Sequence, residues 1–308
     1  MKLRKMTFVV LALLMLILTC CGSPSELSDE VPEETVKETS TEQYTEQTDE
    51  PSAETEAKQE ELQLDKNYSI LFIGNSYTYY NDMPTAIFRM ITKDMGYRVN
   101  VTAITKGSHK LSQFADPTDE YGAKVEKALK GTTKYDYVII QEQSIRPATE
   151  NAPDFYGAVR NLSERIKATG ATPVLYATWG RKSGSSTLNE YGWTNESMTW
   201  KLAAAYQAIG DELGIRVVHV GLAFHDIYTN KSDIELYNSD KTHPSYAGSY
   251  LAATSLFAGI FRVDPTKIDY RGGLSPDEAD ALCEAARKTV FETLPIPLEY
   301  QTTSKGIG

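Results

Sequence analysis

From Asp65 onward, short apolar runs alternate with longer stretches in which apolar residues recur at helical spacing. Most of the apolar runs are continuous and rich in β-branched residues, which is typical of parallel strands covered on both faces. The pattern therefore predicts a doubly wound three-layer α/β/α sandwich of the flavodoxin-like type, with about five parallel strands. The predicted strands are 69–73, 98–103, 137–140, 173–177 and 215–220. The predicted helices are 83–95, 122–130, 152–168, 197–213, 245–261 and 275–294.

The N-terminal 20 residues have the pattern of a signal peptide. Lys2, Arg4 and Lys5 precede an uninterrupted apolar run, Phe8 to Leu18, that is short for a membrane span. The following Leu-Thr-Cys-Cys-Gly resembles a bacterial lipobox, which implies that Cys21 is acylated with diacylglycerol and becomes the mature N-terminus. Cys20 is the alternative lipidation residue, and an ordinary secretory signal with two incidental cysteines is the competing interpretation. The lipobox predicts an extracytoplasmic protein held on the cell membrane by a lipid anchor.

Residues 21–64 are expected to form a disordered acidic linker after the lipidated cysteine. Between residues 22 and 64 there are 14 acidic side chains, two basic ones and almost no large apolar residue. Such a stretch buries too little apolar surface to offset its chain entropy. Most of the formal net charge of −11 therefore belongs to the linker. The chain shows no basic patch, so nucleic acid is not an expected partner. The folded domain is predicted at residues 65–298, with a flexible tail at 299–308.

The ends of the predicted strands are where a fold of this type binds its ligands. The first strand ends in Ile-Gly-Asn-Ser-Tyr, which places Ser76 beyond the sheet. A serine becomes a nucleophile when a histidine accepts its proton and an acidic residue orients that histidine. Asp240 lies three residues before His243, in a turn that precedes a predicted helix. This spacing lets the carboxylate reach the imidazole, so Ser76, His243 and Asp240 are the predicted catalytic residues. His225, followed by Asp226, is the competing base.

Gly74-Asn75-Ser76 after the first strand and Asp240-x-x-His243 before a late helix resemble the SGNH (GDSL-like) hydrolase superfamily over residues 68 to 262. The resemblance implies an oxyanion hole formed by the backbone N–H of Ser76, the backbone N–H of Gly107 and an Asn side chain after the third strand. This chain departs from that pattern, because Gln-Glu-Gln-Ser replaces the Gly-x-Asn-Asp block. An ungapped alignment puts Ile145 at the Asn position. Gln143 is the predicted third donor, Gln141 is the alternative, and the sequence looks like a variant branch.

The resemblance implies an ester hydrolase that acts by acyl transfer. The predicted loops are rich in aromatic and polar residues, which suit sugar rings, and no long apolar lid suggests a lipid substrate. We therefore expect removal of short acyl groups, such as acetyl, from a small molecule or polysaccharide, with Asn75, Tyr77 and Trp179 contacting the substrate. A lipase, a thioesterase and a non-catalytic carbohydrate-binding surface protein are the alternatives. No cluster has metal-ligand spacing, and no cofactor is expected. Cys283 is expected to be a packed thiol, because the chain has too few cysteines for a disulfide framework.

Overall fold

The structure, a computed structural model, describes residues 66–292 and 294–305. A five-stranded parallel sheet, in the order β2-β1-β3-β4-β5, forms the centre of the described domain. This strand order confirms the predicted flavodoxin-like, doubly wound fold. The predicted signal peptide, lipobox and linker lie outside the described residues. The strands are β1 (Asn67–Gly74), β2 (Arg98–Thr105), β3 (Tyr137–Ile140), β4 (Thr172–Tyr176) and β5 (Arg216–Val218).

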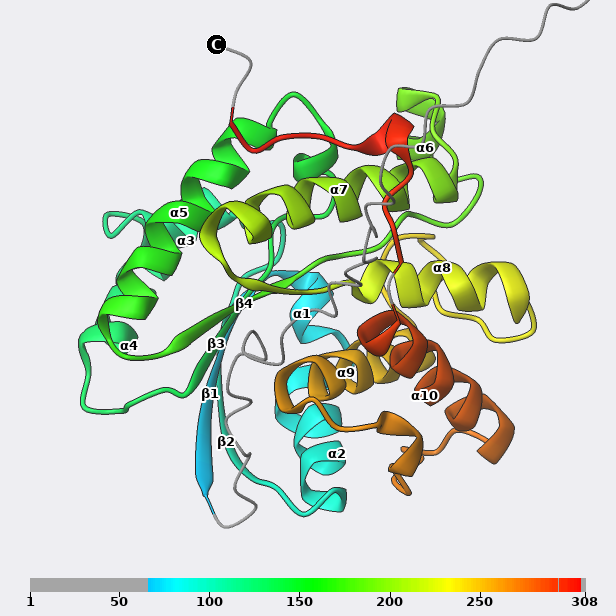
Figure 1. Cartoon of the computed structure of the whole chain (residues 1–308), viewed down its shortest axis with the longest axis horizontal. Helices are drawn as coiled ribbons and strands as arrows, with labels where there is room; N and C mark the ends of the chain where they lie inside the picture. The colour runs from blue at the N-terminus through cyan, green and yellow to red at the C-terminus, as the bar shows by residue number, and fades with distance from the viewer. Residues whose placement is uncertain (1–65, 293, 306–308) are drawn as a thin grey trace, which may run out of the picture. The chain divides into compact units, whose positions relative to one another are not determined.

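Helices cover both faces of the sheet (Figure 1). One face is covered by α3 (Leu111–Ala115), α4 (Glu120–Lys130), α5 (Ala152–Ala168) and α7 (Asn195–Leu213). The other face is covered by a π-helical segment (Met83–Phe88) that continues into α2 (Arg89–Asp94), and by α8 (Val220–Asn230), α9 (Tyr246–Phe261) and α10 (Pro276–Phe291). Two short helices, α1 (Ser76–Tyr79) and α6 (Ser186–Tyr191), lie in connections beyond the carboxyl ends of β1 and β4. No helix in the described part of the chain is long and apolar enough to cross a bilayer.

The strand β1 supplies both apolar layers. Ile70 and Phe72 pack into the core beneath α9, whereas Leu71 and Ile73 pack into the core beneath α5. Alternate residues of a strand point to opposite faces, so burial on both faces explains why the run is continuously apolar. The strand ends at Gly74, where a Cβ would collide with the side chains of Thr78 and Gln141. Only glycine therefore lets the chain turn closely enough to place Ser76 over the end of the strand.

The fifth predicted strand, 215–220, is longer than the observed one. β5 ends at Val218, His219 is the N-cap of α8, and His225 therefore lies on a helix that the pattern did not predict. A continuous apolar run does not distinguish a buried strand from a buried helix, which is the physical reason for this error. The helices α3 and α6 were also not predicted, because both are too short to show a helical period.

Part of the predicted flexible tail, residues 299–308, packs against the domain, and residues 306–308 lie outside the described residues. Ser304 is buried, its hydroxyl donates to Glu212, and its carbonyl accepts a hydrogen bond of 3.0 Å from Arg160. Arg160 and Glu212 lie on α5 and α7, so the segment joins the two helices on that face. Cys283 is a buried free thiol in α10, as expected, and burial raises its pKa to about 11.

Candidate active site

The helix α1 begins at Ser76, and Asn75 is its N-cap. The Asn75 Oδ1 accepts the backbone N–H of Tyr77 at 3.1 Å, and its Nδ2 donates to the carbonyl of His109 at 3.2 Å. A residue at the first helical position has no intrahelical partner for its backbone N–H. The N–H of Ser76 is therefore free to bind a ligand. The side chain of Asn75 therefore shapes the turn that carries Ser76, and it also lines the hollow described below, where its contact with substrate stays a prediction.

Asp240, His243 and Ser76 form a chain of hydrogen bonds. The Asp240 Oδ2 lies 2.6 Å from His243 Nδ1, and His243 Nε2 lies 2.8 Å from Ser76 Oγ. The other carboxylate oxygen accepts the backbone N–H groups of Thr242 and His243, each at 2.9 Å. Burial alone would raise the pKa of Asp240, but the hydrogen bonds from His243 and Thr242 outweigh it and lower that pKa. The carboxylate therefore holds the proton of His243 on Nδ1 and leaves Nε2 to accept from the serine.

Aromatic rings hold the imidazole in this position. The ring of Tyr80 stacks on His243 with centroids 4.3 Å apart and planes at 6°. Trp179 donates from Nε1 to the carbonyl of Thr242 at 3.1 Å, and its ring stacks between Tyr77 and Phe224. Trp179 is completely buried, which corrects the expectation that it contacts substrate. Its indole instead fixes the turn that carries His243.

A hollow of about 110 Å³ opens over Ser76 and His243. Its walls come from the loops after β1, β2, β3 and β4 and from the turn between α8 and α9 that carries His243. Tyr77 lines the hollow although its ring is almost fully buried, and its contact with substrate stays a prediction. Burial raises the pKa of Tyr77, so its hydroxyl stays protonated at neutral pH. The lining residues are Asn75, Ser76, Tyr77, Ser108, Gln143, Ser144, Arg181, Thr242 and His243.

The first glutamine of Gln-Glu-Gln-Ser supports the nucleophile from below. The Gln141 Oε1 accepts the backbone N–H of Asn75 at 2.9 Å and the hydroxyl of Thr78 at 2.8 Å. Its amide nitrogen donates to the carbonyl of Glu142, and the side chain is completely buried. Gln141 is therefore unable to reach the hollow, and the alternative that it donates to an oxyanion is wrong. The buried network that it forms holds the turn around Ser76.

Glu142 points away from Gln141 and binds the loop after β2. The Glu142 Oε1 accepts two backbone N–H groups, that of Leu111 at 3.0 Å and that of Gln143 at 2.5 Å. The other carboxylate oxygen is buried and has no hydrogen-bond partner among the described residues. Burial raises the pKa of Glu142 in spite of these hydrogen bonds. Glu142 was not among the residues predicted from the sequence, yet it joins the end of β3 to the start of α3.

Gln143 and Ser144 are the residues of this block that line the hollow. The Gln143 Nε2 donates to Ser144 Oγ at 3.4 Å, and Ser144 Oγ also accepts from Arg181 Nη2 at 3.2 Å. No carboxylate in the described part of the chain pairs with Arg181. The guanidinium therefore brings an unpaired positive charge to the wall of the hollow, where it favours a bound or developing anion. Arg181 was missed from sequence, and its place directly beyond the fourth strand was the only signal.

The loop after β2 approaches the hollow through Ser108, which has a positive φ of 60°. The backbone N–H of Gly107 donates to no acceptor among the described residues, and a Cβ on Gly107 would lie 3.1 Å from the Tyr79 hydroxyl. Gly107 itself does not line the hollow, so its predicted role depends on its free N–H alone.

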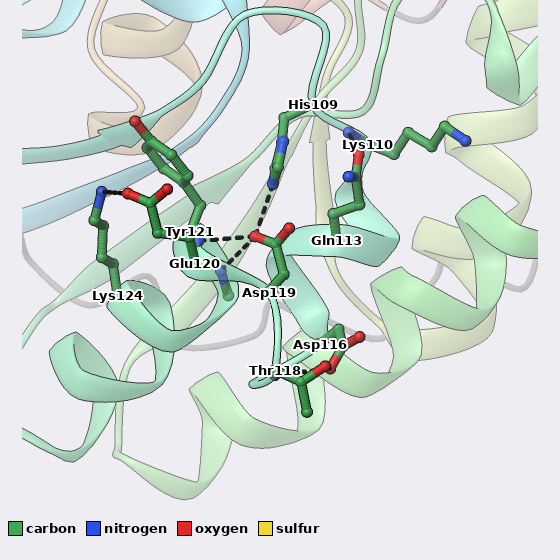
Figure 2. Close-up of polar contacts among 10 residues, drawn as sticks. His109, Lys110, Gln113, Asp116, Thr118, Asp119, Glu120, Tyr121 and Lys124 are labelled. Carbon is green, nitrogen blue, oxygen red and sulfur yellow. Dashed lines mark hydrogen bonds and ion pairs between the residues drawn. The ribbon is translucent and has the colours of Figure 1, made fainter.

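His109 anchors the far side of this loop. Figure 2 shows its Nε2 hydrogen-bonded to Asp119 Oδ1, at 2.9 Å, while the same oxygen accepts the backbone N–H of Tyr121 and of Gly122. Asp119 caps α4, so the loop is tied to the start of that helix. The hydrogen bond from Asn75 to the carbonyl of His109 connects this anchor to the turn of Ser76.

The competing base, His225, lies away from Ser76. Its Nδ1 is 3.0 Å from Asn195 Oδ1, and Asp226 pairs instead with Lys288 at 2.9 Å. His219 Nε2 lies 2.7 Å from Gln207 Oε1, and burial lowers the pKa of His219 to about 4, so it is a neutral structural group. No group of three or more metal-ligating side chains occurs in the described residues.

No protein-family model matches the chain, and no curated protein matches it. The chain is similar to the solved structure of a protein from Slackia heliotrinireducens described as an SGNH hydrolase. The two are 33% identical, with a TM-score of 0.55, over 63% of this chain and 100% of that one. A DUF4886 family protein from Bacteroides uniformis has a TM-score of 0.64, at 17% identity over 78% of this chain and 98% of that one, and shows the shared fold. The chain belongs to the SGNH hydrolases.

Proposed function

We propose that the protein is a serine ester hydrolase that removes short acyl groups, such as acetyl, from carbohydrate. The observation that carries this proposal is the hydrogen-bonded chain from Asp240 through His243 to Ser76, with distances of 2.6 and 2.8 Å. A serine hydroxyl is a weak nucleophile until a neutral imidazole is placed to take its proton. This arrangement supports acyl transfer in preference to a purely binding role.

The reaction begins when His243 Nε2 takes the proton of Ser76 and the Ser76 oxygen attacks the ester carbonyl. The carbonyl oxygen becomes an oxyanion, which the N–H groups of Ser76 and Gly107 and the amide of Gln143 stabilise, while Arg181 contributes positive charge. His243 then protonates the departing alcohol oxygen as the carbon–oxygen bond breaks. Water, deprotonated by the same imidazole, attacks the acyl-serine and releases the acid, and the proton returns to Ser76.

The size of the hollow supports a short acyl group. Its volume of about 110 Å³ corresponds to a few water molecules, since a water molecule occupies about 30 Å³ of the liquid. An acetyl group fits this space, and a long alkyl chain does not. The polar lining from Ser108, Gln143 and Ser144 favours the same conclusion, because a fatty acyl chain binds to apolar walls.

We further propose an extracytoplasmic location on a lipid anchor at Cys21. This proposal is supported by the positively charged start of the chain, the apolar run and the lipobox-like sequence. Fatty-acid labelling of the intact protein should depend on Cys21. If labelling survives Cys21→Ser and disappears with Cys20→Ser, the lipidated residue is Cys20. If neither cysteine is labelled, the proposed anchor is contradicted.

The activity can be tested with 4-nitrophenyl esters of increasing chain length. The wild-type protein should hydrolyse the acetate most efficiently, with kcat/KM falling as the acyl chain exceeds the size of the hollow. Ser76→Ala should abolish the activity and keep the thermal unfolding transition. A wild-type protein that folds and hydrolyses none of the esters would contradict the proposed function, and a preference for octanoate would contradict the short-acyl assignment.

A further inference from the structure

A second hollow, of about 380 Å³, lies between the start of α7, α6 and α8. Its wall includes Trp193, Glu196, His225 and Tyr228, none of which takes part in the proposed reaction. We call it the Trp193 groove. In Figure 1, α6 lies above α8 on the right, and α7 runs across the centre toward α6.

The Trp193 groove adjoins the hollow over Ser76. Arg181 lines the first hollow, and Ser183 and Gly184 line the groove. Positions two residues apart along a chain are separated by at most about 7 Å, so the two spaces are close neighbours. The intervening segment is held in place, because the N–H of Lys182 donates to the carbonyl of Lys241 at 3.0 Å, and Lys241 Nζ donates to the carbonyl of Gly184 at 3.1 Å. Lys241 lies in the turn between Asp240 and His243, which fixes the groove relative to the site.

One wall of the groove offers a fixed hydrogen-bond acceptor. The Asn195 Nδ2 donates to the carbonyls of Gly180 and Arg181, both at 3.0 Å, so its Oδ1 must be an acceptor. His225 Nδ1, 3.0 Å away, therefore carries the proton, and His225 Nε2 has a free lone pair. Nε2 has no hydrogen-bond partner within the described ranges. Burial lowers the pKa of His225, which keeps the ring neutral and this lone pair available at pH 7.

The other groups of the groove complete a mixed polar and aromatic surface. The Tyr228 hydroxyl accepts the N–H of Ser183 at 3.3 Å, which leaves its own proton free to be donated. Trp193 is half-buried beside Tyr191, with ring centroids 4.5 Å apart, and supplies an apolar surface. Glu196 is exposed and has no ion pair among the residues that the structure describes. Its charge adds another acceptor and disfavours anionic ligands.

We propose that the Trp193 groove binds the uncharged sugar units of an oligosaccharide whose acyl ester lies over Ser76. This inference rests on the proposed function and extends it to the alcohol part of the substrate. A sugar presents hydroxyl donors and acceptors around an apolar ring face, which matches the acceptor of His225, the donor of Tyr228 and the indole of Trp193. A fatty acyl chain would leave these polar groups without partners, at a cost in affinity.

Binding is tested without catalysis by calorimetry on the full chain carrying Ser76→Ala, titrated with xylopentaose, cellopentaose and chitopentaose. At least one should bind, and Trp193→Ala should raise its Kd about tenfold. Tyr228→Phe keeps the ring and removes the hydroxyl, and should raise the same Kd about fivefold, which tests the groove even where Trp193→Ala is unstable. Phe291→Ala, which removes an exposed ring from α10, is the matched control and should leave the Kd unchanged.

The activity of the otherwise wild-type chain separates this inference from the proposed function. Trp193→Ala should leave hydrolysis of 4-nitrophenyl acetate unchanged, because that substrate does not reach the groove. The groove assignment is overturned if none of the three oligosaccharides binds, or if both groove substitutions leave the Kd unchanged. It is also overturned if Trp193→Ala raises KM for 4-nitrophenyl octanoate, because that result would identify the groove as a site for an acyl chain. Oligosaccharide binding in a chain that hydrolyses no ester would support the groove and contradict the esterase.

Discussion

Replacing Glu142 tests whether the Gln-Glu-Gln-Ser block positions the site. Glu142→Ala removes the oxygen that accepts the backbone N–H of Leu111 and of Gln143, at 3.0 and 2.5 Å. Glu142→Gln retains an oxygen at the same position and changes only the charge and the second carboxylate atom. The two substitutions therefore separate the hydrogen bonds of this side chain from its charge.

The expected loss follows from the number of groups left without partners. A buried donor that loses its acceptor costs about 1–3 kcal/mol, so two such donors cost about 2–6 kcal/mol in Glu142→Ala. The free energy of unfolding of a domain is typically about 5–15 kcal/mol, and a loss of this size lowers Tm by roughly 4–24 °C for a domain of this length. The free energy of unfolding of Glu142→Gln should remain within about 1 kcal/mol of wild type, because the amide nitrogen replaces a carboxylate oxygen that already has no hydrogen-bond partner among the described residues.

The activity should follow the same order. Glu142→Ala frees the start of α3 and the loop that carries Gly107, and a misplacement of about 1 Å in a site can lower the rate about 10²-fold. The measurements are urea unfolding and kcat for 4-nitrophenyl acetate, in wild type and both variants. If Glu142→Gln loses as much activity as Ser76→Ala, the charge or proton of Glu142 takes part in the reaction and the positioning argument is refuted.

The pH dependence gives an independent check on the same residue. Burial raises the pKa of Glu142 in the folded state, so the folded chain holds this proton more tightly than the unfolded chain does. The free energy of unfolding must then fall as the pH rises from the ordinary pKa of a glutamate through the raised pKa of Glu142 in the folded state. Relative to Glu142→Gln, which has no such proton, the wild type should lose stability as the pH rises above about 4, the ordinary pKa of a glutamate. A difference that stays flat over this range would contradict the raised pKa.

Three further outcomes are expected. Gln143→Ala should lower kcat for 4-nitrophenyl acetate by a factor of about 10²–10³ with little change in KM, because an oxyanion donor acts mainly in the transition state. A change confined to KM would instead make Gln143 a substrate-binding residue. Arg181→Met should also lower kcat, and the loss should be larger at low ionic strength, whereas equal losses at all salt concentrations would exclude an electrostatic role. Removing residues 1–64 should leave a folded, active domain, as judged by cooperative unfolding and ester hydrolysis.

Much of the sheet could be predicted because buried parallel strands leave a continuous apolar run. The first strand was located within two residues at its start and one at its end, 69–73 against Asn67–Gly74. The last strand was extended too far because residues 217–224 are apolar except for His219 and Gly221, on both sides of the boundary between β5 and α8. His225 was consequently placed in a loop. Apolar continuity reports burial, and it does not report which backbone conformation is buried.

The site was predictable where the spacing along the chain determined it. Asp240 and His243 lie in one turn, so their contact is local, and the motif resemblance associated them with Ser76. Trp179 and Arg181 also follow a strand, but their roles depend on long-range packing that spacing does not describe. Trp179 reaches the carbonyl of Thr242, 63 residues away, and Arg181 reaches Ser144, 37 residues away. Sequence position alone gave no reason to bury the first of these side chains and to turn the second toward the hollow.

The departure from the Gly-x-Asn block is explained by the alternation of side chains in an extended segment. Gln141 holds the turn of Ser76, Glu142 on the opposite side holds the start of α3, and Gln143 returns to the hollow. The three residues therefore connect the loops after β1 and β2 to the end of β3. Because Ile145 offers no amide at the position expected for the Asn, we expect the side-chain support for an oxyanion to come from Gln143 and from the unpaired charge of Arg181, in addition to the N–H groups of Ser76 and Gly107. Gln143 and Arg181 follow two different strands, β3 and β4, so the double variant should be measured beside the two single ones.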